Sequence, residues 1–236
     1  MTHHLTRFRF NTRRTDARRL LTSPQSMHAA VMSSFPHLLP GNPDTPRVLW
    51  RVDHTSAAAV HLYIVSPTPP DLTHLVEQAG WPAAEGPHWQ TGDYSRLLDR
   101  LDKGTTWSFR LTANPVHYVR NQDGAPTKRT AHRTPKHQLT WLLERQERGG
   151  FAIPTKPESQ RLVEHGDEHL VTIRSPQPLS FTKKQDDQKH HVRVTAVTYD
   201  GRLEVTDPDR LRNLLTQGLG KARAYGCGLM TLAPIG

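Results

Sequence analysis

This sequence contains almost no cysteine and no long apolar run. Cys227 is the only cysteine among 236 residues, which excludes a disulfide framework and a zinc site built from cysteines. No stretch of about eighteen apolar residues occurs, so we expect no transmembrane helix and no membrane partner. The N-terminus does not have the pattern of a signal peptide. These absences predict a cytoplasmic protein in which Cys227 is a small buried residue.

Acidic residues are scarce relative to basic ones. The chain has 31 Lys and Arg against 22 Asp and Glu, which gives a formal net charge of +9. Its 15 histidines add positive charge below neutral pH. A surface of this kind attracts nucleic acids or anionic membranes. Because no membrane segment is expected, the composition favours a nucleic-acid partner.

Motifs for metal binding are also missing. No paired Asp/Glu motif indicates a two-metal nuclease. None of the histidine pairs has the spacing of a known zinc motif: His3-His4, His132 with His137, and His190-His191. We therefore expect no metal and no cofactor.

Hydrophobic periodicity and turn residues predict the elements of the first half of the chain. Ser23-Pro24 is typical of a helix start, with serine as the cap and proline at the first helical position. The predicted order is a strand at 5–10, a helix at 23–36, strands at 47–53 and 57–65, a helix from Asp71 and a strand near 88–96. The order of elements is therefore β-α-β-β-α-β.

The second half is predicted to repeat this order. Thr134-Pro135 and Asp207-Pro208 are further helix starts, and Asp200-Gly201 is expected to form a turn. The predicted strands are 107–112, 170–173, 192–199 and 229–232. The sequence thus predicts an α+β protein with two tandem ferredoxin-like (RRM-like) βαββαβ domains, residues 1–103 and 104–236. Because an RRM aromatic signature is missing, the usual RRM mode of RNA binding is not expected.

A glycine-rich segment from Gly218 to Leu229 separates the last helix from the last strand. Glycines let backbone amides approach an anion closely, and Lys221 and Arg223 add positive charge beside Gly220. A phosphate-binding loop and a purely structural set of tight turns are equally compatible with this composition. The spacing is not that of a Walker A loop.

The run from Gly218 to Pro234 resembles the glycine-rich signature of CRISPR-associated repeat-processing endoribonucleases, above all the CasE family of type I-E systems. Other matching pieces lie in the family's order along nearly the whole chain: Met27-His28, Leu49-Trp50-Arg51, residues 109–115, Thr134-Pro135, Trp141-Leu142, residues 201–205 and Asp207-Pro208. No single piece is decisive, but their order and spacing together are specific.

The resemblance implies a fold of two ferredoxin-like domains and a defined activity. Members bind the hairpin of CRISPR repeat RNA, cleave precursor crRNA at the 3′ base of the stem without metal, and keep the product while joining other Cascade subunits. The family's catalytic histidine matches His28, and its basic hairpin matches the segment with Lys183, Lys184 and Lys189. Lys128 and Arg129 are further expected RNA contacts.

His28 lies at the edge of the apolar stripe in the first turns of its helix, where the helix dipole favours a neutral imidazole. A neutral imidazole accepts a proton from a 2′-hydroxyl, and an imidazolium gives one to the leaving 5′-oxygen. The sequence leaves both roles open. Well-known members have a tyrosine three residues earlier, where this chain has Gln25, so the second catalytic partner is also open.

The expected reaction is transesterification by the 2′-hydroxyl, which yields a 2′,3′-cyclic phosphate and a 5′-hydroxyl. Two other functions fit the same residues. One is an RNA-hairpin-binding Cascade subunit without catalysis, which the Gln25 substitution favours. The other is a general nucleic-acid-binding protein whose glycine-rich segment is only structural.

Overall fold

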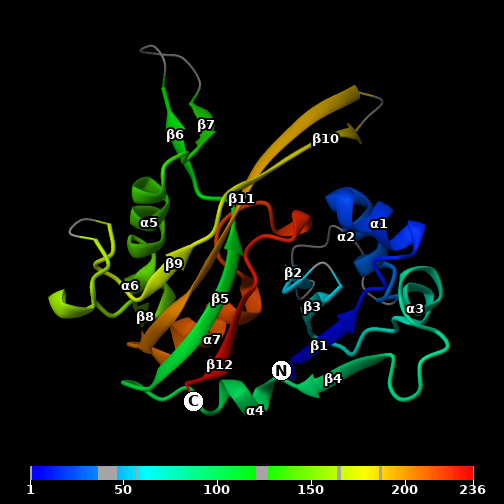
Figure 1. Ribbon diagram of the computed structural model, residues 1–236, viewed down its shortest axis with the longest axis horizontal. Coiled ribbons are helices and arrows are strands. Elements are labelled where there is room, and N and C mark those ends of the chain that lie inside the picture. The colour runs from blue at the N-terminus through cyan, green and yellow to red at the C-terminus, as the bar shows by residue number, and fades with distance from the viewer. Residues whose placement is uncertain are drawn as a thin grey trace.

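The computed structural model describes residues 2–36, 47–56, 58–120, 127–163, 166–185 and 188–235. Two antiparallel sheets follow one another along the chain, and a β-hairpin stands beside the second (Figure 1). Among the described residues no helix has both the length and the apolar composition needed to cross a bilayer.

The first sheet has the strand order β2-β3-β1-β4. Its strands are β1 (His4–Arg9), β2 (Leu49–His54), β3 (Val60–Ser66) and β4 (Trp89–Asp93). Helices α1 (Thr15–Thr22) and α2 (Pro24–Met32) join β1 to β2, and α3 (Thr73–Ala79) joins β3 to β4. The first and third strands are central, as the ferredoxin-like arrangement requires.

Alternation of side chains explains how the first sheet builds its core. Phe8 of β1 is 1% exposed, whereas Arg7 and Arg9 on either side of it face solvent. Phe8 packs in one cluster with Val31 of α2 and Leu75 of α3, so the helices cover one face of the sheet. The strand predicted at 5–10 is confirmed, and it has one apolar and one basic face.

The second sheet repeats the arrangement with longer strands, in the order β10-β11-β5-β12. Its strands are β5 (Thr106–Ala113), β10 (Gln177–Gln185), β11 (Gln188–Val205) and β12 (Met230–Pro234). Short strands β8 (Phe151–Ala152) and β9 (Val171–Ile173) pair with the C-terminal part of β11. The helices are α5 (Pro135–Leu143), α6 (Gln146–Gly149) and α7 (Pro208–Gln217). The α+β class with tandem ferredoxin-like units is confirmed.

The predicted helix starts are confirmed by their capping contacts. The Ser23 hydroxyl accepts from the Ser26 amide at 3.2 Å, and the Thr134 hydroxyl accepts from the His137 amide at 3.4 Å. The Asp207 carboxylate accepts from two amides of the first turn of α7. In all three helices proline fills an early position in which no intrahelical amide partner is needed.

The turn expected at Asp200-Gly201 is wrong, because β11 passes through both residues without interruption. Gly201 is required for another reason. A Cβ at this position would lie 2.4 Å from the carbonyl oxygen of Leu170, because the segment entering β9 crosses close to β11. Glycine inside a strand is typical of sites where another backbone segment approaches closely.

Several short elements had not been predicted. Helix α1 precedes the expected first helix and carries part of the arginine-rich stretch 13–19. Helix α4 (Ser95–Leu98) takes the end of the segment expected to continue as a strand to residue 96. The basic stretch near residue 128 forms a hairpin of β6 (Val116–Val119) and β7 (Lys128–Ala131). Two 3₁₀ turns complete the elements, η1 (Glu158–Gln160) and η2 (Arg223–Tyr225).

One arginine joins the two sheets. Arg51 of β2 is 2% exposed and binds the Asp53 carboxylate through two nitrogens, at 2.6 and 2.9 Å. Its remaining donors cross to the second sheet, to the carbonyls of Arg110 at 2.9 Å and Leu229 at 3.0 Å and to the Thr231 hydroxyl at 2.8 Å. The guanidinium is therefore satisfied by both sheets at once.

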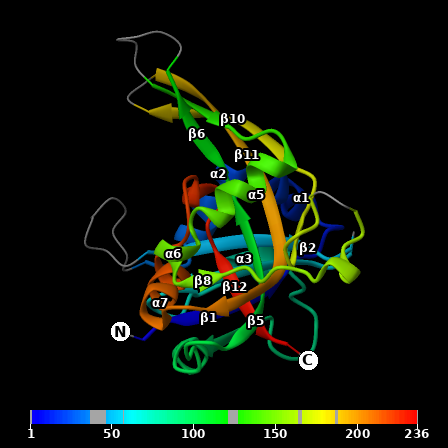
Figure 2. The ribbon, with the colours of Figure 1, turned by 90° about the vertical axis from the view of Figure 1, so that its left-hand side faces the viewer.

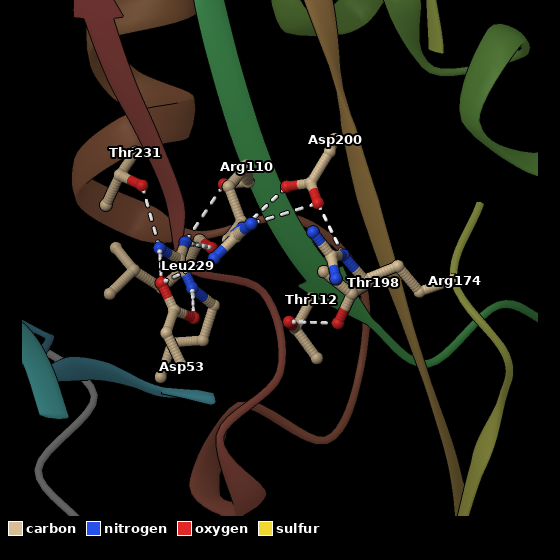
Figure 3. A network of polar contacts seen from close by, with 9 residues as sticks. Asp53, Arg110, Thr112, Arg174, Thr198, Asp200, Leu229 and Thr231 are labelled. Carbon is tan, nitrogen blue, oxygen red and sulfur yellow. Dashed lines mark hydrogen bonds and ion pairs between the residues drawn. The ribbon is translucent and has the colours of Figure 1, made fainter. Parts of the chain in front are cut away.

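The network continues across the second sheet (Figure 3). Arg110 lies between two carboxylates, 3.5 Å from Asp53 and 2.5 Å from Asp200. Asp200 also pairs with Arg174 at 2.6 Å. Hydrogen bonds from both arginines keep the pKa of Asp200 below its ordinary value although burial opposes this. The charges alternate in sign from Arg51 outward, so each buried charge has a partner.

Candidate functional site

His28 lies in the middle of α2 and is half-buried. The helix turns Met27 and Val31 into the first core, which places His28 at the margin between core and surface. Gln25 lies one turn earlier and is exposed. The histidine is thus on the second helix of the chain, and α1 precedes it.

The glycine-rich segment packs against this helix. Its 3₁₀ turn η2 contacts both α2 and β2. Gly226 has a φ of 77°, and a Cβ there would lie 2.7 Å from the indole of Trp50 on β2. Because Gly226 approaches Trp50 so closely, the glycine-rich segment, which leads into the second sheet, packs directly against the first sheet. The fold therefore brings His28 together with the segment that contains Gly220, Lys221 and Arg223.

Several amides of the segment are already engaged in internal hydrogen bonds. The amide of Leu219 donates to Gly228, that of Gly228 to Thr112, and that of Gly226 to Arg223. These hydrogen bonds favour a structural role for the glycines and reduce the number of amides left for an anion. Phosphate binding by the segment stays a prediction that rests mainly on its cations.

The cations of the segment form a positive patch. Arg223 donates to the Gly218 carbonyl at 2.9 Å, and its buried Nε atom has no hydrogen-bond partner in the described part of the chain. Burial and the nearby charge of Arg47 lower the pKa of Arg223. Lys221 is exposed. The positive charges of Arg223 and Arg47 repel each other, and Lys221 adds a further positive charge to the segment. A bound anion would reduce this repulsion.

Two hairpins project from the same side of the molecule in both views (Figures 1 and 2). Lys128 and Arg129 lie on β7, and both side chains are exposed. Lys183, Lys184 and Lys189 lie near the tip of the β10–β11 hairpin, where Lys184 is paired with Lys189 across the strands. The hairpin expected around these three lysines is confirmed, but their side chains lie outside the described ones.

A small cavity links the base of the β10–β11 hairpin to α2. It measures about 90 Å³, and its lining includes Met27 of α2, Leu179 of β10 and Tyr225 of η2. Tyr225 also packs edge-on against Phe181, with ring centroids 4.6 Å apart. The hairpin, the glycine-rich segment and the helix of His28 therefore meet in one place.

Cys227 lies in the same region and is 1% exposed. It packs against Val194 and Ala196 of β11, as expected for a small buried residue. Burial raises the pKa of its thiol to about 12. The thiol therefore stays protonated at neutral pH and is a poor nucleophile.

The sequence did not reveal a histidine cluster at the base of β6 and β7. The ring of His132 lies 4.4 Å from that of His117 and 5.9 Å from that of His137, measured between centroids. Burial and then its two neighbours lower the pKa of His132. Within the described ranges, no three His, Cys, Asp or Glu side chains are placed to hold a metal ion. The sequence analysis singled out only the pair His132 and His137, because His117 lies fifteen residues before His132 in the sequence.

Comparison with known proteins identifies relatives over the full length. A family model described as CRISPR associated protein matches residues 3–234. The CRISPR-associated endoribonuclease Cse3 of Thermus thermophilus is 30% identical over 98% of this chain and 99% of its own. The Cascade subunit CasE of Escherichia coli is 27% identical over 84% and 88%. The structure of Thermus thermophilus Cse3 bound to an RNA representing a pre-cleavage complex has a TM-score of 0.71 at 27% identity, covering 99% and 100%.

Proposed function

This chain belongs to the family of CRISPR-associated proteins, and on that basis we propose that it is an endoribonuclease that binds the hairpin of CRISPR repeat RNA and processes precursor crRNA. Its full-length relative Cse3 is named for endoribonuclease activity. The observation that carries the proposal in this chain is the contact between the helix of His28 and the cationic glycine-rich segment. We assign proton transfer to His28 and anion binding to the cations of this segment.

These groups match what RNA transesterification needs. The 2′-hydroxyl attacks the adjacent phosphorus as its proton leaves, and the 5′-oxygen departs as it gains one. His28 handles one of these protons, as base or as acid. Lys221 and Arg223 stabilise the additional negative charge of the phosphorane. The products are a 2′,3′-cyclic phosphate and a 5′-hydroxyl, and the step uses no metal or other cofactor.

The two hairpins bind the RNA stem. Side chains cannot read bases in the deep, narrow major groove of A-form RNA, but a thin charged hairpin can lie against its phosphates. Lys183, Lys184 and Lys189 contact phosphates from β10–β11, and Lys128 and Arg129 do so from β7. Holding the stem at both hairpins fixes the scissile phosphate next to α2 and favours the in-line geometry.

We propose further that the cleaved RNA stays bound and that the protein works as a Cascade subunit in the cytoplasm. The relative CasE, 27% identical over 84% of this chain, is named as a subunit of Cascade. The units that carry out these tasks are residues 1–103, with the catalytic helix, and residues 104–236, with the hairpins and the glycine-rich segment.

A second candidate is an RNA-hairpin-binding subunit without catalysis. The exposed Gln25 favours it, because a glutamine cannot transfer the proton that a tyrosine in this turn can. Both candidates predict tight binding of the repeat hairpin, and only one predicts cleavage.

The test is a cleavage and binding assay with purified protein in EDTA, using the repeat hairpin of the host and an unrelated hairpin of equal length. We expect tight binding of the repeat hairpin alone and a single cut beside its stem. Tight binding without any cut would favour the non-catalytic subunit. Equal affinity for both hairpins would contradict repeat recognition and favour a general nucleic-acid-binding protein.

A further inference from the structure

A second cavity of about 450 Å³ opens in the second ferredoxin-like unit. Four elements contribute to its lining: α5, α6, α7 and the start of β6. Gly218, Gly220 and Lys221 of the glycine-rich segment close one end. Its volume lies within the range of pockets that hold small ligands, about 300–1,000 Å³, and a single nucleotide is a ligand of this size.

A stacked pair forms part of the wall. The guanidinium of Arg145 lies 4.1 Å from the centre of the Trp141 ring, and its Nη1 donates to the Trp141 carbonyl at 2.5 Å. The indole is 2% exposed and covers one face of the guanidinium. The flat group is thereby held in a fixed orientation. Arginine planes of this kind are surfaces on which RNA bases stack.

A second stacking group stands at the rim. Tyr118 of β6 lines the cavity, and it is 61% exposed, which is unusual for so large an aromatic side chain. In the described part of the chain no ring contact or hydrogen bond holds the Tyr118 side chain. An exposed aromatic ring beside a cavity is typical of proteins that bind unpaired bases.

The cavity also carries positive charge, only part of which is matched by carboxylates. Arg148 and Lys221 line it, both are exposed, and neither forms an ion pair within the described residues. Arg210 differs, because Asp207 neutralises it at 3.2 Å. The side-chain amides of Asn213 and Gln217 on α7 face the same space and can meet the edge of a base.

The position of the cavity relates it to the RNA. Arg223 lines the cavity and also begins η2, the turn that packs on the helix of His28. On the other side, β6 runs from the cavity into the hairpin with Lys128 and Arg129. The cavity therefore lies between the site of cleavage and one of the two hairpins expected to hold the stem.

We propose that this cavity binds an unpaired nucleotide of the repeat RNA that adjoins the stem. Its base stacks on Tyr118 and on the face of Arg145 opposite Trp141, and its phosphate meets Arg148. The proposal rests on the proposed function, since it assumes that the stem is held by the hairpins. It adds a contact outside the stem that extends recognition to the flanking single strand.

The test compares three RNAs by fluorescence anisotropy: the stem-loop alone, the stem-loop with an unpaired 5′ flank, and the stem-loop with an unpaired 3′ flank. A 2′-deoxy nucleotide at the scissile position prevents cleavage. We expect one flank to tighten binding about fivefold or more, the range of a single stacked base. Tyr118→Ala and Arg148→Ala should remove this gain and leave the affinity for the stem-loop alone nearly unchanged.

Two variants serve as controls. Tyr118→Phe keeps the ring and should keep the gain. Arg96→Ala removes one exposed arginine from α4, remote from the cavity, and measures the general effect of removing a charge. A flank that adds nothing, or a gain that Tyr118→Ala leaves intact, would overturn the inference. Failure to bind the stem-loop at all would instead contradict the proposed function.

Discussion

At the scale of single residues, Arg51 illustrates how a buried charge fixes the relation of two sheets. The guanidinium is almost fully buried, and its hydrogen bonds are divided between Asp53 on its own strand and three acceptors of the second sheet. Because α2 packs on the first sheet and the β10–β11 hairpin extends from the second, Arg51 helps to set the distance between His28 and this hairpin. Its effect on the site is one of position, since Arg51 lies in the inter-sheet network and not beside His28.

We predict that Arg51→Met lowers the free energy of unfolding by about 3–5 kcal/mol, measured by urea denaturation. The Asp53 carboxylate, 8% exposed, would lose its main partner and stay buried. Arg174→Ala is the matched control, because that arginine is 57% exposed and should contribute at most about 1 kcal/mol. Equal effects of the two variants would contradict a central role for Arg51.

Gly226 offers a test of how the glycine-rich segment is seated on the first sheet. We predict that Gly226→Ala destabilises the protein and slows cleavage, because the new Cβ meets the Trp50 ring in addition to the strain of a positive φ. Gly86→Ala isolates the strain, since Gly86 has a φ of 87° and nothing within 4 Å. It should cost about 1–2 kcal/mol and leave cleavage by the folded protein unchanged. Equal cleavage rates for both variants would contradict the importance of the approach to Trp50.

The lowered pKa of His132 predicts how the free energy of unfolding changes as the pH falls. Its pKa is held below the ordinary value of 6.5, chiefly by burial, so the folded chain binds this proton less readily than the unfolded chain. The free energy of unfolding should therefore fall as the pH drops below about 6.5 and level off below the folded pKa. We expect His132→Gln to lose less stability between pH 7.5 and 5.5, in urea titrations, than the unaltered protein. An identical loss would show that another group is responsible.

At the scale of elements, local signals and tertiary contacts differ in what they reveal. The helix starts at Ser23, Thr134 and Asp207 were predictable because a capping residue and a proline act within a few residues. Gly201 was misread because the carbonyl that requires glycine belongs to Leu170, a residue in another segment. The β6–β7 hairpin was missed because its strands are only four residues long and neither has a buried apolar face that alternates with a polar one.

The two hairpins should contribute separately to the grip on RNA. We predict that replacing Lys183, Lys184 and Lys189 by alanine weakens binding of the repeat hairpin and makes it less dependent on salt. The slope of log K against log salt should fall by about 0.7–0.9 for each phosphate that the variant no longer neutralises. The double variant Lys128→Ala/Arg129→Ala should show a smaller change of the same kind. An unchanged slope in the triple variant would contradict phosphate binding by the β10–β11 hairpin.

At the scale of the whole molecule, the repeated βαββαβ order was legible from the sequence, because hydrophobic periodicity reports each element locally. The candidate site was predicted mainly from the resemblance of the sequence to the CasE family. Nothing in the periodicity indicates that η2, close to the C-terminus, would pack on the helix of His28 near the start of the chain. The Arg51 network and the cavity around Arg145 were not predicted either, since each joins side chains from distant segments and leaves no repeating pattern.

The most direct test of the central claim is a single-turnover cleavage assay in EDTA on the host's repeat hairpin, with analysis of the product ends. It compares the unaltered protein with His28→Ala and with His88→Ala, which removes an exposed histidine outside the site. We predict a 2′,3′-cyclic phosphate and a 5′-hydroxyl from the unaltered protein and from His88→Ala. His28→Ala should bind the hairpin and fail to cut it. Equal cleavage by His28→Ala, or a product with a 5′-phosphate, would contradict the mechanism.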